Sequence, residues 1–372
     1  MPELRDRTCA SPVDAVLAEF DRRKELFQER CQRTITQVTD ILREKGIPTH
    51  SINSRVKGKK ELEAKYLSAE KDYTKLDHVP DVAGLRVITF YSDEINEVAN
   101  VLRREFEVIK EDDKRKGKAN EFGYSALHLD CRYSKAQLDR TECKRFNGYT
   151  FEIQIATILG HAWAEIHHGW YDRQSSSTLE EERRFNRLAA VLELVDHEFL
   201  EIRRKKYERE RIASVQVAAE SPEIPITLES LKAFIEQKDI VGEIDEKLGR
   251  VLGKPVKGAL SSGQIGAMVE SIKFASISTV QGLESMLRKT SPVLEEFQAG
   301  CAPIWRNISI PNATYSRGYC VAQLVNLLIS AGGEDKYKSC FRSGRFGSYP
   351  GHDLSAQVAI AKEIVERHRL SD

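Results

Sequence analysis

The segment 149–157 constrains the fold of this chain most, because its pattern favours a single kind of element. Apolar side chains alternate there with polar or small ones, namely Phe151, Ile153 and Ile155 with Glu152, Gln154 and Ala156. A period of two predicts a strand with one buried and one open face. Glu152 on the open face is either a solvated carboxylate, which is the common case, or part of a functional site.

A helix is predicted directly after this strand. Thr157 is a suitable N-cap, and Ala162, Trp163 and Ile166 recur at helical spacing. The polar residues of the helix include Glu165, His167 and His168. A carboxylate on an open strand face next to these side chains is a suitable place for a metal ion and phosphate groups.

The overall composition is that of a soluble protein with a highly charged surface. The 372 residues are 41% apolar and 31% charged, and the formal net charge is zero, so attraction for phosphate must be local. No apolar run approaches the ~18 residues that a membrane span needs, and no secretory signal begins the chain. Seven cysteines without a Cys-x-x-Cys pair predict reduced thiols and a cytoplasmic location.

Basic residues gather in the first part of the chain. Residues 12–45 carry an apolar stripe and predict one long helix that covers a sheet. A short strand at 52–56 then leads into a helix near Lys59. Five basic residues occur there: Arg55, Lys57, Lys59, Lys60 and Lys65. Such a cluster can hold a polyphosphate, although a charge run is more often a solvated helix face.

Two further segments carry candidate site residues. Asp81 precedes the predicted strand 85–90, and a carboxylate at a strand entrance suits Mg²⁺. A helix is predicted at 92–106 and a strand at 107–110, followed by a mobile polar loop at 111–118. Tyr124, at the start of a strand over 122–133, can stack on a nucleobase or simply pack at a sheet edge.

The second part of the chain is predicted to be mainly helical. A long helix runs from Leu179 to about Arg211, and the Ser- and Pro-containing segment 213–225 is expected to be a linker. Six helices follow, at about 228–236, 240–252, 264–272, 279–289, 319–330 and 354–369. Cys301, Cys320, Cys340 and His352 lie too far apart for an ordinary zinc signature.

Five short motifs occur in a fixed order along the first part. They are Arg55, Lys57 and Lys65; Asp81 before Gly84 and Arg86; Gly-Tyr-Ser-Ala-Leu-His at 123–128; Glu-Ile-Gln-Ile-Ala-Thr at 152–157; and the helix 161–168. Together they resemble the synthetase domain of the RelA/SpoT family, the alarmone synthetases, and especially its small members, over about residues 45–205. Glu61 stands where the family has Ser, and Ala156 where it usually has Arg.

The resemblance implies a domain order and a fold. An N-terminal helix (1–50) is expected to pack on a pyrophosphotransferase domain (51–212), which the linker joins to a helical accessory or regulatory domain (226–372). The fold class implied is α/β, with a mixed sheet similar to that of nucleotidyltransferases, followed by a mainly helical C-terminal domain.

The resemblance also implies an activity, which is Mg²⁺-dependent transfer of pyrophosphate from ATP to the 3′-hydroxyl of GDP or GTP, making (p)ppGpp. Asp81 and Glu152 are the implied metal ligands and catalytic residues. The implied ATP-binding residues are Arg55, Lys57, Lys65 and Arg86. The implied acceptor-binding residues are Tyr124, His128, Lys114, Lys116, Lys118, Gln154 and His168, and Glu165 is a further neighbour.

Two alternatives remain open at the level of sequence. The protein can be a toxic small synthetase that pyrophosphorylates tRNA 3′ ends, in a toxin–antitoxin or phage-defence role, with residues 226–372 as inhibitor or sensor. It can also be a degenerate nucleotide-binding regulator, which Ala156 and Glu61 favour and which Asp81, Tyr124 and Glu152 oppose. The helical domain can instead stabilise the protein, form a homo-oligomer or bind a regulatory protein.

Overall fold

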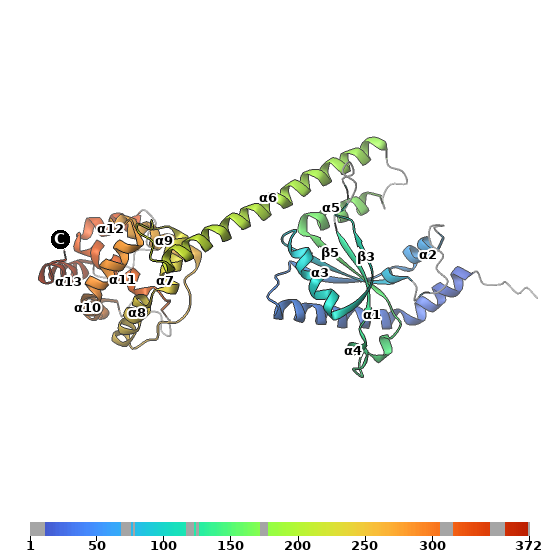
Figure 1. The fold of residues 1–372 in the computed structure, drawn as a ribbon, viewed down its shortest axis with the longest axis horizontal. Coiled ribbons are helices and arrows are strands. Elements are labelled where there is room, and N and C mark those ends of the chain that lie inside the picture. Colours follow the sequence, from blue (N-terminus) through green and yellow to red (C-terminus); the bar gives the residue numbers. More distant parts are fainter. Residues whose placement is uncertain are drawn as a thin grey trace, which may run out of the picture. The chain divides into compact units, whose positions relative to one another are not determined.

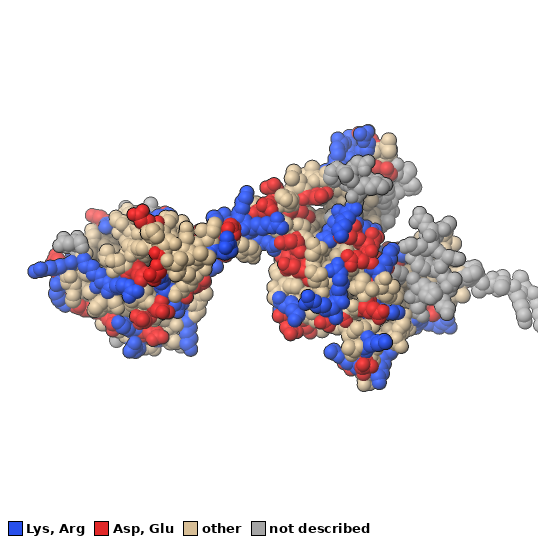
Figure 2. Space-filling view, in the orientation of Figure 1, with Lys and Arg blue, Asp and Glu red and all other residues tan. Residues whose placement is uncertain are grey.

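The computed structural model describes residues 12–67, 76, 79–116, 123, 126–171, 178–305, 315–342 and 354–370. These residues form two compact units, which divide between Arg203 and Arg204. The family resemblance, over about residues 45–205, falls almost wholly within the first unit. In the view of Figure 2, acidic and basic side chains are interspersed on both units, in keeping with the net charge of zero.

The first unit contains a five-stranded mixed sheet (Figure 1). The strands are β1 (Ser51–Val56), β2 (Ala83–Thr89), β3 (Phe106–Asp113), β4 (Leu127–Tyr133) and β5 (Phe151–Thr157). Their order across the sheet is β1-β2-β5-β4-β3, in which only β2 and β5 are parallel. The predicted α/β class with a mixed sheet is therefore confirmed.

Helices cover both faces of this sheet. They are α1 (Pro12–Glu44), α2 (Lys59–Leu67), α3 (Glu94–Glu105), the short α4 (Lys135–Leu138), α5 (Ile158–Tyr171) and the first part of α6 (Leu179–Ala218), and 3₁₀ turns occur at η2 (Pro80–Val82) and η3 (Lys144–Phe146). The apolar residues of β5 pack in one core with Val38 and Leu42 of α1 and with Ile95, Val98 and Leu102 of α3. The opposite face, which carries Glu152 and Gln154, lies under α5.

The predicted start of α5 is confirmed in detail. The backbone N–H of Gly160 donates to Thr157 Oγ1 at 3.0 Å, so Thr157 caps the helix. Thr157 Oγ1 also donates to Asp196 Oδ2 of α6 at 2.5 Å. Further along α6, Arg203 pairs with Asp93 and Glu94 at the start of α3. These contacts hold the first part of α6 within the first unit.

The second unit is helical, as predicted. Its helices are α7 (Leu228–Gln237), α8 (Asp239–Leu252), α9 (Ser262–Phe274), α10 (Val280–Trp305), α11 (Tyr319–Ala331), α12 (Glu334–Arg342) and α13 (Leu354–Arg367). Helix α10 continues 16 residues beyond the predicted end at Lys289, through Pro292 and Pro303, and α12 was not predicted. Apolar residues of these helices share one buried core.

The segment 213–225 does not form the predicted linker. Helix α6 continues to Ala218, and Val217 and Ile224 are buried in the core of the second unit. The segment after the helix is also bonded to this unit, because Val280 N donates to Ile224 O at 2.8 Å. The Ser and Pro residues suggested a flexible connection, whereas the apolar side chains between them decide the packing.

Two negative findings concern the described residues alone. None of their helices is long and apolar enough to cross a membrane. Their six cysteines are buried free thiols, namely Cys31, Cys131, Cys143, Cys301, Cys320 and Cys340.

Candidate active site

The three central strands carry two rows of residues on the face under α5. The register aligns Arg86, Gln154 and His128 in one row, and Gly84, Glu152 and Asp130 in the next. The close packing of the strands favours glycine at position 84, because a Cβ there would lie 3.3 Å from the Glu152 carbonyl oxygen. Side chains from strands far apart in sequence therefore meet around Glu152.

The Glu152 carboxylate is held from two sides. His128 Nδ1 lies 2.9 Å from Glu152 Oε1, and Gln154 Nε2 donates to Oε2 at 2.6 Å. Burial favours the protonated form, but the hydrogen bonds from His128 and Gln154 outweigh it and lower the pKa of Glu152. Glu152 is therefore a fixed, ionised carboxylate near neutral pH.

Asp81 is the second carboxylate of the face, and two lysines converge on it. Lys57 Nζ at the end of β1 lies 2.6 Å from Asp81 Oδ2, and Lys65 Nζ of α2 lies 2.5 Å from the same oxygen. Burial opposes ionisation, but the two ammonium groups outweigh it and lower the pKa of Asp81. The structure thus joins three predicted site residues from three different elements.

Two adjoining cavities meet at these carboxylates. The cavity on the β1 side has a volume of ≈ 530 Å³ and is lined by Arg55, Lys57 and Glu61, among others. The cavity on the β3 side has a volume of ≈ 480 Å³ and is lined by Lys110, Asp112 and Lys114 of the β3 strand and its end, and by residues of α5. Five residues line both cavities, namely Asp81, Arg86, Glu152, Gln154 and His168.

Arg86 and Arg55 are both paired with glutamates. Arg86 Nε donates to Gln154 Oε1 at 3.3 Å, and the Arg86 guanidinium also pairs with Glu165 of α5. Arg55 pairs with Glu61 at the first turn of α2. Each guanidinium lines the β1-side cavity, where it can contact an anionic ligand.

The predicted acceptor residues are placed unequally. Lys114 lines the β3-side cavity, but Lys116 does not, and its Nζ lies 3.3 Å from Asp113 Oδ2 on the other side of the strand end. Tyr124 and Lys118 lie outside the described residues. His168 lines both cavities, so it belongs to the shared wall.

Several cavity residues were missed at the level of sequence. The β3-side cavity is also lined by Lys110, Asp112, Asp130, His161 and Trp163. Asp130 could have been found from its place in the alternating segment 127–133. Burial, and then the charge of Glu152, raises the pKa of Asp130. Burial lowers the pKa of His161, which is therefore a neutral ring near pH 7.

The site has features that suit one hard cation. Among the described residues no donor reaches Asp81 Oδ1, although this oxygen is buried. Buried carboxylate oxygens normally have a partner, so a bound ion would satisfy this atom. No cluster of three or more metal-binding side chains occurs in the described part of the chain. Mg²⁺ commonly uses one or two carboxylates together with substrate phosphates, and Asp81 and Glu152 are the carboxylates that would hold it here.

Residues 54–176 match the family model described as "Region found in RelA / SpoT proteins". The first unit contains a RelA/SpoT domain. The match ends before the second unit begins. No curated protein matches this sequence.

Two solved structures are similar to about half of this chain. The small alarmone synthetase 1 from Bacillus subtilis is 22% identical, with a TM-score of 0.44, over 51% of this chain and 99% of that chain. A GTP pyrophosphokinase family protein from Streptococcus pneumoniae is 24% identical, with a TM-score of 0.43, over 51% of this chain and 95% of that chain.

The two departures from the family pattern have different surroundings in this RelA/SpoT domain. Ala156 is 2% exposed and lines neither cavity, so a small side chain suits its closely packed position. Glu61 lines the β1-side cavity, pairs with Arg55 and accepts the Gly58 backbone N–H at 2.8 Å. Glu61 therefore places a negative charge at the wall of the β1-side cavity.

Proposed function

We propose that the RelA/SpoT domain transfers pyrophosphate from ATP to the 3′-hydroxyl of GDP or GTP. The observation that carries the proposal is the pair of adjoining cavities that share Asp81 and Glu152. A transfer between two substrates needs two sites that meet at the reacting atoms. The cations on opposite sides of the shared wall suit one phosphate-bearing ligand in each cavity.

The β1-side cavity is the proposed ATP site. Arg55, Lys57 and Arg86 line it, and Lys65 reaches the same Asp81 as Lys57. In phosphoryl transfer, most of the catalysis comes from positioning and from neutralising phosphate charge. Lys65 itself lines the β3-side cavity, so in this structure the basic residues that can contact a triphosphate in the β1-side cavity are Arg55, Lys57 and Arg86.

The β3-side cavity is the proposed acceptor site. Lys114, joined by Lys110, would contact the acceptor phosphates, while His128, Gln154 and His168 would surround the ribose. Tyr124, Lys116 and Lys118 remain predicted acceptor contacts, of which Lys116 pairs with Asp113 in this structure. The acceptor hydroxyl would then lie near Glu152, at the wall common to both cavities.

Asp81 and Glu152 are the proposed ligands of Mg²⁺. The buried Oδ1 of Asp81 and the ionised Glu152 carboxylate suit a hard cation. When bound, Mg²⁺ would neutralise charge on the ATP phosphates. Lys57 and Lys65, which hold Asp81 by its other oxygen, keep this carboxylate in place.

The chemical step breaks one phosphorus–oxygen bond and forms another. The acceptor 3′-oxygen bonds to the β-phosphorus of ATP, and the bond from this phosphorus to the α,β-bridging oxygen breaks, which releases AMP. Glu152 orients the hydroxyl and accepts its proton. His128 and Gln154 fix Glu152 for this role by their hydrogen bonds.

The test is a transfer assay with ATP labelled in its β- or γ-phosphate, in separate reactions with GDP, GTP, AMP and bulk tRNA. We expect labelled product with GDP or GTP, and for Glu152→Gln a rate lower by about a hundredfold or more, because the charge is lost. Glu107→Gln, which changes an exposed glutamate at the far end of β3, is the matched control.

Other outcomes would change the proposal. Label transferred to tRNA alone would favour the tRNA-modifying alternative. Transfer to no acceptor by the wild-type chain would contradict the proposed activity. An undiminished rate for Glu152→Gln would remove Glu152 from its proposed role while leaving the activity in place.

A further inference from the structure

The strand β3 changes the face to which its alternate residues point. Phe106 and Val108 belong to the core with α3, and the register with β4 then shifts between Val108 and Lys110. A bulge of this kind adds one residue to a strand and so reverses the alternation. After the bulge Lys110 aligns with Asp130 and therefore lies on the cavity face.

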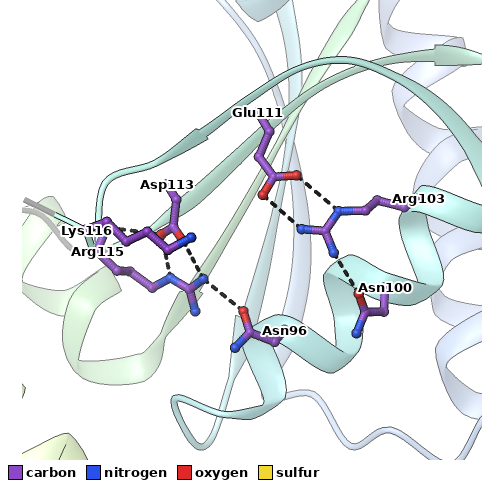
Figure 3. A network of polar contacts seen from close by, with 7 residues as sticks. All are labelled: Asn96, Asn100, Arg103, Glu111, Asp113, Arg115 and Lys116. Carbon is purple, nitrogen blue, oxygen red and sulfur yellow. Dashed lines mark hydrogen bonds and ion pairs between the residues drawn. The ribbon is translucent and has the colours of Figure 1, made fainter.

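Beyond the bulge, alternate side chains of β3 and its end point to opposite faces of the sheet, one toward the β3-side cavity and the other toward α3. Lys110, Asp112 and Lys114 line the β3-side cavity. Glu111, Asp113 and Arg115, which alternate with them, point to α3 and form a polar network with it (Figure 3). The alternation continues past the last strand residue because Lys114 N donates to Ala126 O at 3.0 Å.

Arg115 holds the end of the strand in this network. Its Nε donates to Asp113 Oδ1 at 2.7 Å and its Nη2 donates to Asp113 Oδ2 at 2.9 Å. The same Nη2 donates to Asn96 Oδ1 of α3, also at 2.9 Å. The Asp113 side chain is only 10% exposed, so water competes little for the two charge-assisted bonds from Arg115 to Asp113.

A second contact ties the strand to the same helix face. Arg103 Nε and Nη2 donate to the two oxygens of Glu111 at 3.1 and 2.9 Å, and Arg103 Nη1 donates to Asn100 at 2.7 Å. Asn96, Asn100 and Arg103 recur at spacings of four and three, which places them on one face of α3. The helix therefore fixes β3 at two points on the side opposite the cavity.

We propose that Arg115 is a positioning residue for the acceptor site, which it serves by fixing the strand end so that Lys114 faces the cavity. The inference rests on the proposed function, since Lys114 is there an acceptor contact. Arg115 does not line the β3-side cavity and touches neither carboxylate. Arg115 restricts the backbone of Lys114 before the acceptor binds. Less conformational entropy is then lost on binding, which favours acceptor affinity.

The experiment measures kcat and both KM values for Arg115→Met, Arg115→Lys and Arg132→Met in the full chain. For Arg115→Met we expect the KM for GDP to rise about tenfold, while kcat and the KM for ATP stay within about twofold. Arg115→Lys keeps one charged donor, so its KM for GDP should lie between those of the wild type and Arg115→Met. Arg132 pairs with Glu107 at the far end of β3, so Arg132→Met is the control and should change neither KM.

A second readout is hydrogen exchange of peptides that cover residues 110–116. In Arg115→Met, the amides of residues 110–116 should exchange faster than in the wild type, while exchange in β5 stays unchanged. An unchanged KM for GDP, equal rises in both KM values, or unchanged exchange at 110–116 would each overturn the inference while leaving the activity intact. Absence of transfer by the wild-type chain would instead refute the proposed function, and the inference with it.

Discussion

Two carboxylates, the half-buried Asp81 of the first unit and the buried Asp245 of the second, have opposite surroundings. Asp81 in the first unit meets Lys57 and Lys65 through one oxygen, and no described residue donates to the other. Asp245 in the second unit accepts the backbone N–H groups of Gly318 and Cys320 at 2.7 Å each, one per oxygen. Asp245 thus satisfies the start of α11, whereas Asp81 keeps an unsatisfied oxygen.

The difference separates a carboxylate that serves the fold from one that can serve a ligand. Ammonium groups lower the pKa of Asp81 in spite of its burial, while burial raises the pKa of Asp245 in spite of its backbone bonds. Position 318, at the start of α11, requires glycine. Its φ of +90° disfavours other residues, and a Cβ there would lie too close to the Ile235 side chain. A buried charge without a complete set of partners is costly unless binding completes the set.

The largest expected effects come from Asp81→Asn and Asp245→Asn measured side by side. Asp81→Asn should lower the transfer rate by about a hundredfold or more and change stability by less than about 1 kcal/mol. Asp245→Asn leaves one buried N–H facing an amide N–H₂, so it should destabilise the second unit by about 2 kcal/mol. Hydrogen exchange of α8 and α11 peptides measures this loss in the full chain.

Similar behaviour of the two variants would contradict the different roles assigned to Asp81 and Asp245. Faster exchange throughout the first unit of Asp81→Asn, with the transfer rate retained, would make Asp81 a structural residue. Unchanged protection of α11 in Asp245→Asn would show that its cap contributes little. Glu246→Ala, a substitution at an exposed residue next to Asp245, is the control for the second unit.

A smaller effect is expected at Glu61, whose carboxylate neutralises Arg55 beside the β1-side cavity. Glu61→Gln keeps an acceptor for the Gly58 N–H but removes the charge, so Arg55 can contact ATP phosphates more strongly. We expect the KM for ATP to fall about threefold, with the KM for GDP unchanged. Glu63→Gln on the same helix is the control, and an unchanged or higher KM for ATP would contradict the prediction.

The smallest effect concerns Asp130, whose pKa is raised by burial and then by Glu152. The folded chain binds this proton more tightly than the unfolded chain, so stability is lost as the pH rises through the raised pKa. Asp130→Asn cannot ionise and should be more stable than wild type at pH 7, by less than about 1 kcal/mol. Chemical denaturation at several pH values tests this, because the difference should shrink in acid; a constant difference would exclude ionisation as its cause.

Local patterns predicted the elements around Glu152 well. The alternation at 151–157 and the cap at Thr157 defined β5 and the start of α5, because each depends on neighbours in the sequence. The end of α10 was predicted too early, since packing in the second core outweighs the cost of Pro292. The segment 213–218 was missed as helix because burial of Val217 depends on partners far along the chain.

The candidate site shows the same division. Asp81, Lys57 and Lys65 were named from motifs. Their separation in sequence gave no information that both lysines contact the same oxygen of Asp81. Lys110 and Asp130 were missed because they become neighbours only when β3 pairs with β4. Tyr124, outside the described residues, stays a prediction from the motif alone.

Local patterns indicated the periods of β5 and of most helices, the charged residues available and the RelA/SpoT motifs, because each of these depends on near neighbours in the chain. Which face of the sheet those charges occupy depends on how the strands pair. In β3 the bulge after Val108 sends Lys110 to the cavity and Glu111 to α3. The physical reason is that a strand's facing is set by its register with a partner strand, and one added residue reverses it.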